Sequence, residues 1–131
     1  MNGEAEMTIK LVGVLRRRED VPPDEFRRYW LEEHGPLVRS IVEAAGATRY
    51  VQTHTIDTAM NAAVASGRAA VEPFDGIVEV WFEGTLEDLG ALLGTEDFQR
   101  ANATLIEDEL KFIDPQRSSF FLTEEHIILD K

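Results

Sequence analysis

Two histidines are the residues of this chain best suited to acid–base chemistry. His34 follows Phe26 and Trp30 at intervals of four residues, so it lies on the apolar stripe of a predicted helix and should point at a sheet. A buried imidazole with a pKa near neutrality can move a proton between two atoms of a substrate. The structural alternative is a core histidine that hydrogen-bonds a strand carbonyl and braces the Gly35-Pro36 step. The two roles can coexist.

A second candidate group comes from the predicted strand over residues 47–56. Alternation places Tyr50, Gln52 and His54 on one face of this strand. They would offer a phenol, an amide and a base to one ligand, and a carbonyl substrate needs such donors where its enolate charge develops. The alternative for His54 is a partly solvated position at the end of the sheet. If this face looks toward the helix, His34 and His54 open into one cavity, which is the arrangement we expect.

Three aromatic side chains are candidates for the wall of a substrate pocket: Tyr29, Trp30 and Trp81. Aromatic residues in such positions belong to the core more often than to a ligand site. Glu79 is unusual within an apolar strand. It is either a pocket acid with a raised pKa or a residue that faces solvent or a subunit interface, and we favour the second.

No metal or cofactor site is predicted. Glu124, Glu125 and His126 are metal-ligand residue types, but neighbours on a strand point to opposite faces and cannot converge on one ion. The sequence lacks the patterns of the common serine hydrolases, nucleotide-binding loops and zinc proteases, which leaves a cofactor-independent enzyme open.

The composition indicates which classes of binding partner are not expected. The net charge of −12 repels phosphate backbones, so nucleic acid is not an expected partner. No stretch approaches the roughly 20 apolar residues of a membrane helix, and the N-terminus lacks a basic region followed by a long apolar run, so we expect a cytoplasmic protein without membrane contact. Cysteine is absent, which excludes a disulfide framework and a cysteine nucleophile.

These residues are positioned by elements in the order βαββαβ. The first helical stripe starts after Pro22-Pro23, runs through Phe26, Trp30, Leu37 and Ile41, and is interrupted at Gly35-Pro36. Thr85 and Thr95 are N-cap candidates for two later helices. The strands are predicted over residues 7–16, 47–56, 76–83 and 119–129. Residues 57–73 form a helical lid or a mobile loop, which we expect to border the pocket mouth.

The fold class predicted from this order is α+β, ferredoxin-like, with a four-stranded antiparallel sheet. A single domain spans residues 7–131, and residues 1–6 form a flexible N-terminus. The helices suffice to cover only one face of the sheet, while both faces carry large apolar groups. A homodimer with two sheets face to face would bury the second face and protect the strand edges.

The segment over residues 26–37, FRRYWLEEHGPL, resembles the signature of the EthD family, an aromatic helix running into His-Gly-Pro-Leu. The opening strand IKLVGVLRRR, the strand YVQTH, the strand FDGIVEVWFE and Asp108 followed by Phe112-Ile113-Asp114 agree with it. The resemblance covers most of residues 9–129 and is weakest over 57–73. It implies a dimeric α/β barrel of two ferredoxin-like protomers, each with a small-molecule pocket.

The resemblance leaves the reaction open, because one fold hosts many activities. The first hypothesis is a cofactor-independent lyase, cyclase or isomerase, in which His34 and His54 shuttle protons on a small apolar carbonyl compound, such as a polyketide-like or aromatic-catabolic intermediate. The second is a cofactor-free monooxygenase, which would consume oxygen. The third is a non-catalytic ligand-binding accessory protein of a degradation pathway. Haem handling is a weaker fourth hypothesis, since a histidine alone is poor evidence for an axial ligand.

Overall fold

The computed structural model describes residues 7–131, and the N-terminal segment expected to be flexible lies outside them. Four strands form one antiparallel sheet: β1 (Met7–Leu15), β2 (Arg49–His54), β3 (Gly76–Gly84) and β4 (Ser119–Glu124). Their order across the sheet is β2-β3-β1-β4. The two central strands of the sheet, β1 and β3, pair with each other over their whole length.

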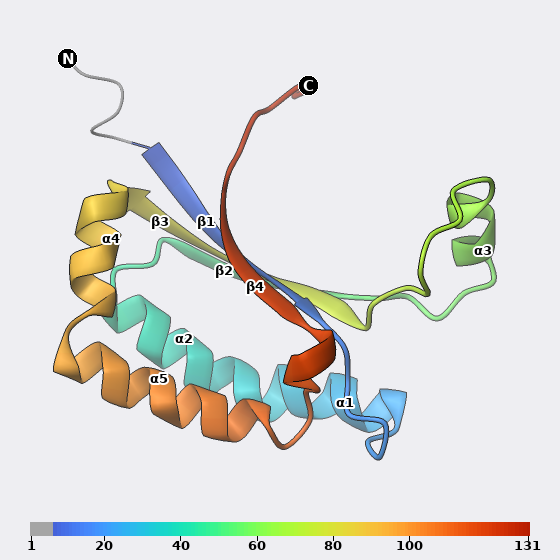
Figure 1. Ribbon diagram of the computed structural model, residues 1–131, viewed down its shortest axis with the longest axis horizontal. Helices are drawn as coiled ribbons and strands as arrows, with labels where there is room; N and C mark the ends of the chain where they lie inside the picture. Colours follow the sequence, from blue (N-terminus) through green and yellow to red (C-terminus); the bar gives the residue numbers. More distant parts are fainter. Residues whose placement is uncertain (1–6) are drawn as a thin grey trace.

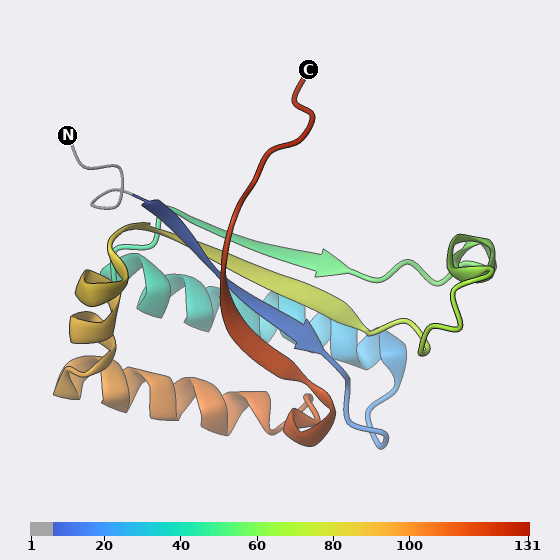
Figure 2. The same cartoon turned by 45° about the horizontal axis from the view of Figure 1, so that its top comes forward.

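The helices cover one face of this sheet (Figures 1 and 2). The first helical segment runs without a break from Pro23 to Ala44. It consists of α1 (Pro23–Tyr29), the π-helical turn η1 (Trp30–His34) and α2 (Gly35–Ala44). The second consists of α4 (Leu86–Leu93) and α5 (Glu96–Glu109), and the short 3₁₀ turn η2 (Pro115–Arg117) leads into β4. The predicted ferredoxin-like βαββαβ fold is therefore confirmed. Among the described residues, no helix is long and apolar enough to cross a membrane.

The π-helical turn corrects the prediction that the first helix is interrupted at Gly35-Pro36. The backbone N–H of Gly35 donates to the carbonyl oxygen of Trp30, five residues back, and the helix continues. Pro36 has no N–H, and its ring would clash with a carbonyl in a regular helix, so a locally wider turn accommodates it. The turn also delays the helical phase by one residue. Val38 is consequently buried, whereas the predicted stripe residue Leu37 is only half-buried.

Local sequence signals set the starts of α4 and α5, as predicted. The Thr85 side chain accepts a hydrogen bond from the Asp88 N–H, and the Asp88 carboxylate accepts from the Thr85 N–H, which is a full capping box. Thr95 caps α5 by accepting from the Phe98 N–H. Gly46 follows α2 with φ +89°, a left-handed conformation that favours glycine.

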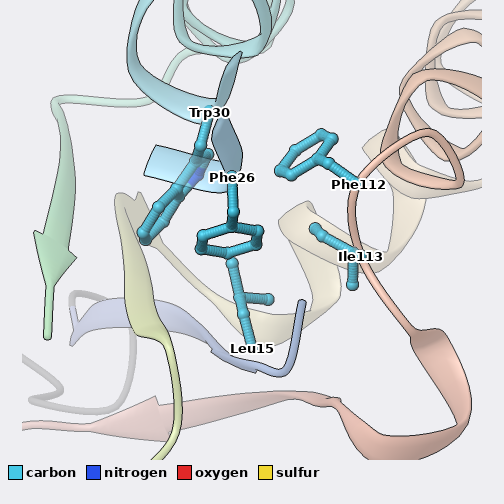
Figure 3. Close-up of a cluster of buried hydrophobic side chains, with 5 residues drawn as sticks. All are labelled: Leu15, Phe26, Trp30, Phe112 and Ile113. Atoms are coloured by element: carbon cyan, nitrogen blue, oxygen red, sulfur yellow. The ribbon is translucent and has the colours of Figure 1, made fainter. Parts of the chain in front are cut away.

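One hydrophobic cluster joins the two helical segments to the sheet, and its buried residues are Leu15, Phe26, Trp30, Phe112 and Ile113 (Figure 3). A second cluster under α4 consists of Ile9, Val80, Phe82 and Leu89. The Trp30 indole lies directly on the β3 backbone at Gly76. A Cβ atom at Gly76 would sit 2.4 Å from the Trp30 ring, so only glycine permits this contact.

The face of the sheet opposite the helices is uncovered. We call it the outer sheet face; it carries Val12, Val14, Val51, Ile77, Trp81 and Phe121. Lys10 and Glu79 form a 2.7 Å ion pair within it. Glu79 therefore faces this surface, as predicted. The last strand ends at Glu124 rather than at Leu129, because its ladder with β1 ends at the Ile9 pair, near the start of β1. Residues 125–131 leave the sheet (Figure 1).

Residues 57–73 form an excursion beyond the end of β2. They contain the short helix α3 (Met60–Ala65), which lies away from the sheet and helices (Figures 1 and 2). Every residue of α3 is at least partly exposed. The sequence left a helical lid and a mobile loop as alternatives for this segment. The structure shows a short exposed helix flanked by loops.

Candidate active site

A cavity of about 340 Å³ lies between the helices and the sheet, within the size range of small-molecule sites. Most of its wall is aliphatic or aromatic and comes from β1, β3, α2, α4 and α5. Four side chains bring strongly polar atoms to it: His34, Tyr50, Asn102 and Glu109. The lining residues Ile106, Phe120 and Leu122 are 43–48% exposed. Since they lie on α5 and β4, the cavity opens between these two elements.

His34 is held at the inner end of its imidazole by Asp108. The His34 Nδ1 and Asp108 Oδ2 atoms are 2.6 Å apart, and only 5% and 12% of the two side chains are exposed. A carboxylate can only accept, so the proton of the neutral ring resides on Nδ1 and the Nε2 lone pair is left for the cavity. Burial lowers the pKa of His34, although the Asp108 carboxylate favours the imidazolium. The neutral base is therefore the main form at pH 7.

Asp108 is stabilised as a carboxylate by three donors. The Tyr29 hydroxyl donates to its Oδ1 atom over 2.6 Å, and the Lys111 ammonium lies 3.2 Å from the same oxygen. Burial opposes ionisation of Asp108, but the hydrogen bonds from Tyr29, His34 and Lys111 outweigh it and lower the pKa of the carboxyl. Asp108 is thus an ionised acceptor at neutral pH, and it orients the His34 ring through Nδ1.

Glu109 occupies the opposite environment, although it is the next residue of α5. Its Oε2 atom lies 4.0 Å from His34 Nε2, on the cavity side of the ring. Burial in the apolar wall, together with the neighbouring Asp108 charge, raises the pKa of Glu109 to about 7. The two nitrogens of one imidazole therefore face two different carboxyl groups, one ionised and one partly protonated at neutral pH.

Tyr50, Gln52 and His54 share the helix-facing side of β2, as alternation predicted, and form a hydrogen-bonded row. The Gln52 amide donates to the Tyr50 hydroxyl over 2.9 Å and to the Trp30 carbonyl over 2.8 Å. Its oxygen accepts from His54 Nε2 over 2.8 Å, so His54 carries its proton on Nε2. Tyr50 reaches the cavity, where burial raises the pKa of its phenol.

The expectation that His34 and His54 open into one cavity is wrong. The His54 ring stacks on the Trp30 indole, with centroids 4.4 Å apart and planes 14° from parallel. Trp30 lines the cavity and His54 does not, so the indole separates the two histidines. Residues 57–73, expected at the pocket mouth, also contribute nothing to the lining. The described residues contain no cluster that could hold a metal ion.

Three further sequence candidates lie outside the cavity: Gln52, Trp81 and Tyr29. The Gln52 amide is engaged by Trp30, Tyr50 and His54 instead of facing a ligand. Trp81 belongs to the outer sheet face, where Lys10 and Arg49 approach its ring and its indole N–H donates to Glu125. It cannot share a ligand with His34, because the sheet lies between them. Tyr29 does not line the cavity and instead directs its hydroxyl to Asp108.

The sequence matches the family model described as "EthD domain" over residues 18–116. The chain belongs to the EthD domain family. The EthD match includes His34, Tyr50, Asp108 and Glu109, so the polar end of the cavity lies within it. It leaves out β1 and β4, which complete the sheet and the cavity mouth.

Solved structures agree with the EthD assignment at the level of fold. An EthD family protein from Bacillus halodurans superposes with a TM-score of 0.60 at 20% identity, covering 92% of this chain and 100% of that one. An EthD-like protein from Ralstonia eutropha gives 0.58 at 14% identity, covering 95% and 96%. A dimeric ferredoxin-like protein of unknown function from Thermobifida fusca gives 0.55 at 12% identity, covering 91% and 92%. No functionally curated protein matches the chain.

The EthD-domain residues that sequence analysis did not identify as chemical groups are Asp108, Glu109 and Asn102. Asp108 had entered only as part of the family resemblance. A signal was nevertheless present. Glu109 lies four residues after Leu105 and three before Phe112, so it sits on the apolar stripe of its own helix, where an acidic residue is out of place.

Proposed function

We propose that this EthD-domain protein is a cofactor-independent lyase, cyclase or isomerase that uses His34 to move protons on a small, neutral, largely apolar carbonyl compound. The observation that carries the proposal is the orientation of one ring. His34 Nδ1 is fixed by Asp108 at 2.6 Å, and its Nε2 faces an apolar cavity. A base held in this way presents a free lone pair to the cavity, where it can accept a proton from the carbon beside a carbonyl.

The sequence of events follows from the two environments of the ring. His34 Nε2 accepts a proton from the carbon beside the substrate carbonyl, and the electron pair moves to the carbonyl oxygen. The imidazolium that forms is stabilised by the ionised Asp108 on its other nitrogen. The Tyr50 hydroxyl and the Asn102 amide supply hydrogen-bond donors within the same cavity for the developing oxygen charge.

The lining also supports a neutral substrate. Among the described residues that line the cavity, none is lysine or arginine, and Glu109 contributes a carboxyl group. An anionic substrate would lose its hydration without gaining a counter-charge. A compound with a carbonyl and a hydrophobic frame meets both the apolar wall and the few donors.

Proton exchange on a simple ketone tests the proposal without the natural substrate. The probe is α-tetralone, a bicyclic aromatic ketone, in D₂O, with loss of the proton signal beside its carbonyl followed by NMR. We expect the protein to accelerate exchange, and His34→Ala to reduce the acceleration about 10²-fold. His126→Ala removes an exposed histidine outside the site and should leave the rate unchanged.

The other outcomes separate the alternative functions. Binding of α-tetralone, seen as chemical-shift changes of cavity residues, without any acceleration of exchange would support a ligand-binding accessory protein. Equal acceleration by the wild type and His34→Ala would remove His34 from the chemistry. Oxygen uptake with an electron-rich phenol would support a monooxygenase instead.

We further propose that the protein is a homodimer in which the outer sheet faces of two chains meet. The apolar residues of this face have no covering element among the described residues. The Thermobifida fusca protein, which shares the fold, is described as dimeric. Burial of this face would also cover Trp81, which explains a large aromatic side chain on the side of the sheet away from the helices.

A further inference from the structure

We infer that Glu109 is a second proton-transfer residue of this site, acting as an acid toward the substrate oxygen while His34 acts as a base toward the adjacent carbon. The inference rests on the proposed function and names the partner that His34 needs for it. Its basis is the placement of both groups on one wall of the cavity, with His34 Nε2 and Glu109 Oε2 4.0 Å apart.

The 4.0 Å separation leaves both atoms available. It exceeds the roughly 3.2 Å limit of a good hydrogen bond, so the ring and the carboxyl do not satisfy each other. Within residues 7–131, the Glu109 carboxyl has no hydrogen-bond partner. A substrate that lies against both groups on the cavity side can have one atom about 3 Å from each of them, which is the reach required for proton transfer.

The neighbouring residue shows why Glu109 suits the acid role. Asp108 has three donors and is ionised, whereas the Glu109 side chain, 25% exposed, lines the largely apolar cavity without such donors. The titratable groups near Glu109 are His34 from η1, Tyr50 from β2 and Asp108 from its own helix. Burial and the Asp108 charge raise its pKa to about 7, so a proton is available at neutral pH. Two carboxyl groups in opposite environments are the usual arrangement for separate acid and electrostatic roles.

The step balances without a further reactant. The C–H bond next to the carbonyl breaks, and its proton goes to His34 Nε2. A C=C bond forms, the C=O π bond opens, and the oxygen takes the Glu109 proton, which yields the neutral enol. One water bridging the 4.0 Å gap can then return the proton from the imidazolium to the carboxylate. Because both groups lie on one wall, both transfers occur on the same side of the substrate.

The test compares Glu109→Gln with Glu107→Gln in α-tetralone exchange as a function of pH. Glutamine keeps the shape and a hydrogen-bond donor but cannot give up a proton. The wild-type rate should rise as His34 becomes neutral and fall above about pH 7 as Glu109 ionises. Glu109→Gln should lose about 10²-fold in rate and the decline on the alkaline side. Glu107, which is exposed on the same helix, should behave as wild type when replaced.

Failure of this inference differs from failure of the proposed function. If His34→Ala abolishes exchange while Glu109→Gln keeps both the rate and the alkaline decline, His34 acts without Glu109. If neither variant changes exchange, the proposed function fails with it. If the ketone does not react with the protein, an NMR titration of Glu109 tests the inference without a substrate. The ¹³C-labelled Glu109 carboxyl should titrate near pH 7, and titration at the ordinary value near 4.5 would overturn the inference.

Discussion

The His34 imidazole and the Asp108 carboxylate meet at 2.6 Å although 74 positions separate them in the sequence. The contact joins η1 to the C-terminal turn of α5 and ties the base to its orienting group. Because the carboxylate accepts the Nδ1 proton, the contact selects one of two tautomers of the ring. The chemistry proposed here depends on that selection.

Asp108→Asn should therefore reduce α-tetralone exchange at least about 10²-fold while leaving the ring in place. An amide can present its NH₂ group to Nδ1, which would move the ring proton to Nε2 and block the base. Nitrogen-15 NMR of the histidines reads the tautomer directly. Tyr29→Phe removes another partner of Asp108 but keeps the carboxylate, so its tautomer should match the wild type. An unchanged tautomer in Asp108→Asn would contradict the orienting role.

Glu109→Gln should stabilise the protein at alkaline pH. The folded-state pKa of Glu109, about 7, lies above its ordinary 4.5, so the folded state binds more protons and the unfolding free energy falls as pH rises through this window. The glutamine variant escapes this loss. Its advantage over the wild type should grow by about 2–3 kcal/mol between pH 5 and pH 8, at about 1.4 kcal/mol per pKa unit. Urea unfolding of both proteins at the two pH values measures the difference.

The wild type must be compared with Glu109→Gln because His34, present in both, changes the unfolding free energy with pH in the opposite direction. Its lowered pKa makes the unfolded state bind more protons below pH 6.5, so its contribution to stability rises with pH there and is lost as pH falls. An advantage of Glu109→Gln that is independent of pH would argue that Glu109 is ionised at both values.

Gly76→Ala should destabilise the fold by about 1–3 kcal/mol, since the new methyl group would sit 2.4 Å from the Trp30 ring and 2.9 Å from the Thr53 carbonyl oxygen. Gly90→Ala is the matched control: it lies in α4 with open space around its Cβ position and should gain about 0.5–1 kcal/mol from helix propensity. Thermal unfolding of both variants tests the contrast. Equal effects would show that the Trp30 contact is not restrictive.

Val12→Glu should convert the dimer to a monomer. Val12 lies on the outer sheet face between Glu79 and Phe121, where a second carboxylate would be buried beside a like charge. Light scattering of the wild type should give about twice the chain mass of 14.8 kDa, and the variant should give the chain mass. Leu31→Glu changes an exposed leucine on the helical side and should remain dimeric. A monomeric wild type would exclude the face-to-face arrangement.

Residues 57–73 should exchange their amide hydrogens faster than any other internal segment. Small side chains bury little area, and α3 has only six residues, so local opening costs little free energy. Hydrogen exchange followed by mass spectrometry compares this segment with β3. Protection equal to that of β3 would show an additional contact that covers the excursion.

Periodicity predicted the fold and the faces of the strands. It could not predict that the Trp30 side chain separates His34 from His54. Alternation correctly put Tyr50, Gln52 and His54 on one side of β2. The separation of His54 from His34 arises because the Trp30 indole approaches Gly76, a contact across three elements that no local pattern encodes. Asp108 and Glu109 were missed as functional groups for a similar reason. Their roles depend on Tyr29 of α1 and His34 of η1, which are distant in the sequence.

The sequence also did not predict which residues of the helix after Trp30 are buried. Regular helical spacing after Trp30 selects Leu37, whereas the structure buries Val38. The difference of one position originates in the π-helical turn, and Pro36 was the only local indication of it. Proline marked the place correctly, but whether a helix breaks or widens there depends on the packing on both sides.

Because of the π-helical turn, the number of residues between Trp30 and His34 determines whether the histidine faces the cavity. Phe26, Trp30, His34 and Val38 follow one another at intervals of four, and each interval overshoots a regular helical turn by about 40°. The extra residue of the turn cancels most of the accumulated rotation, so all four stay buried on one side. Deleting a single residue between Trp30 and His34 would rotate the histidine about 100° around the axis. A related chain with that deletion would keep the histidine in an alignment and lose it from the cavity.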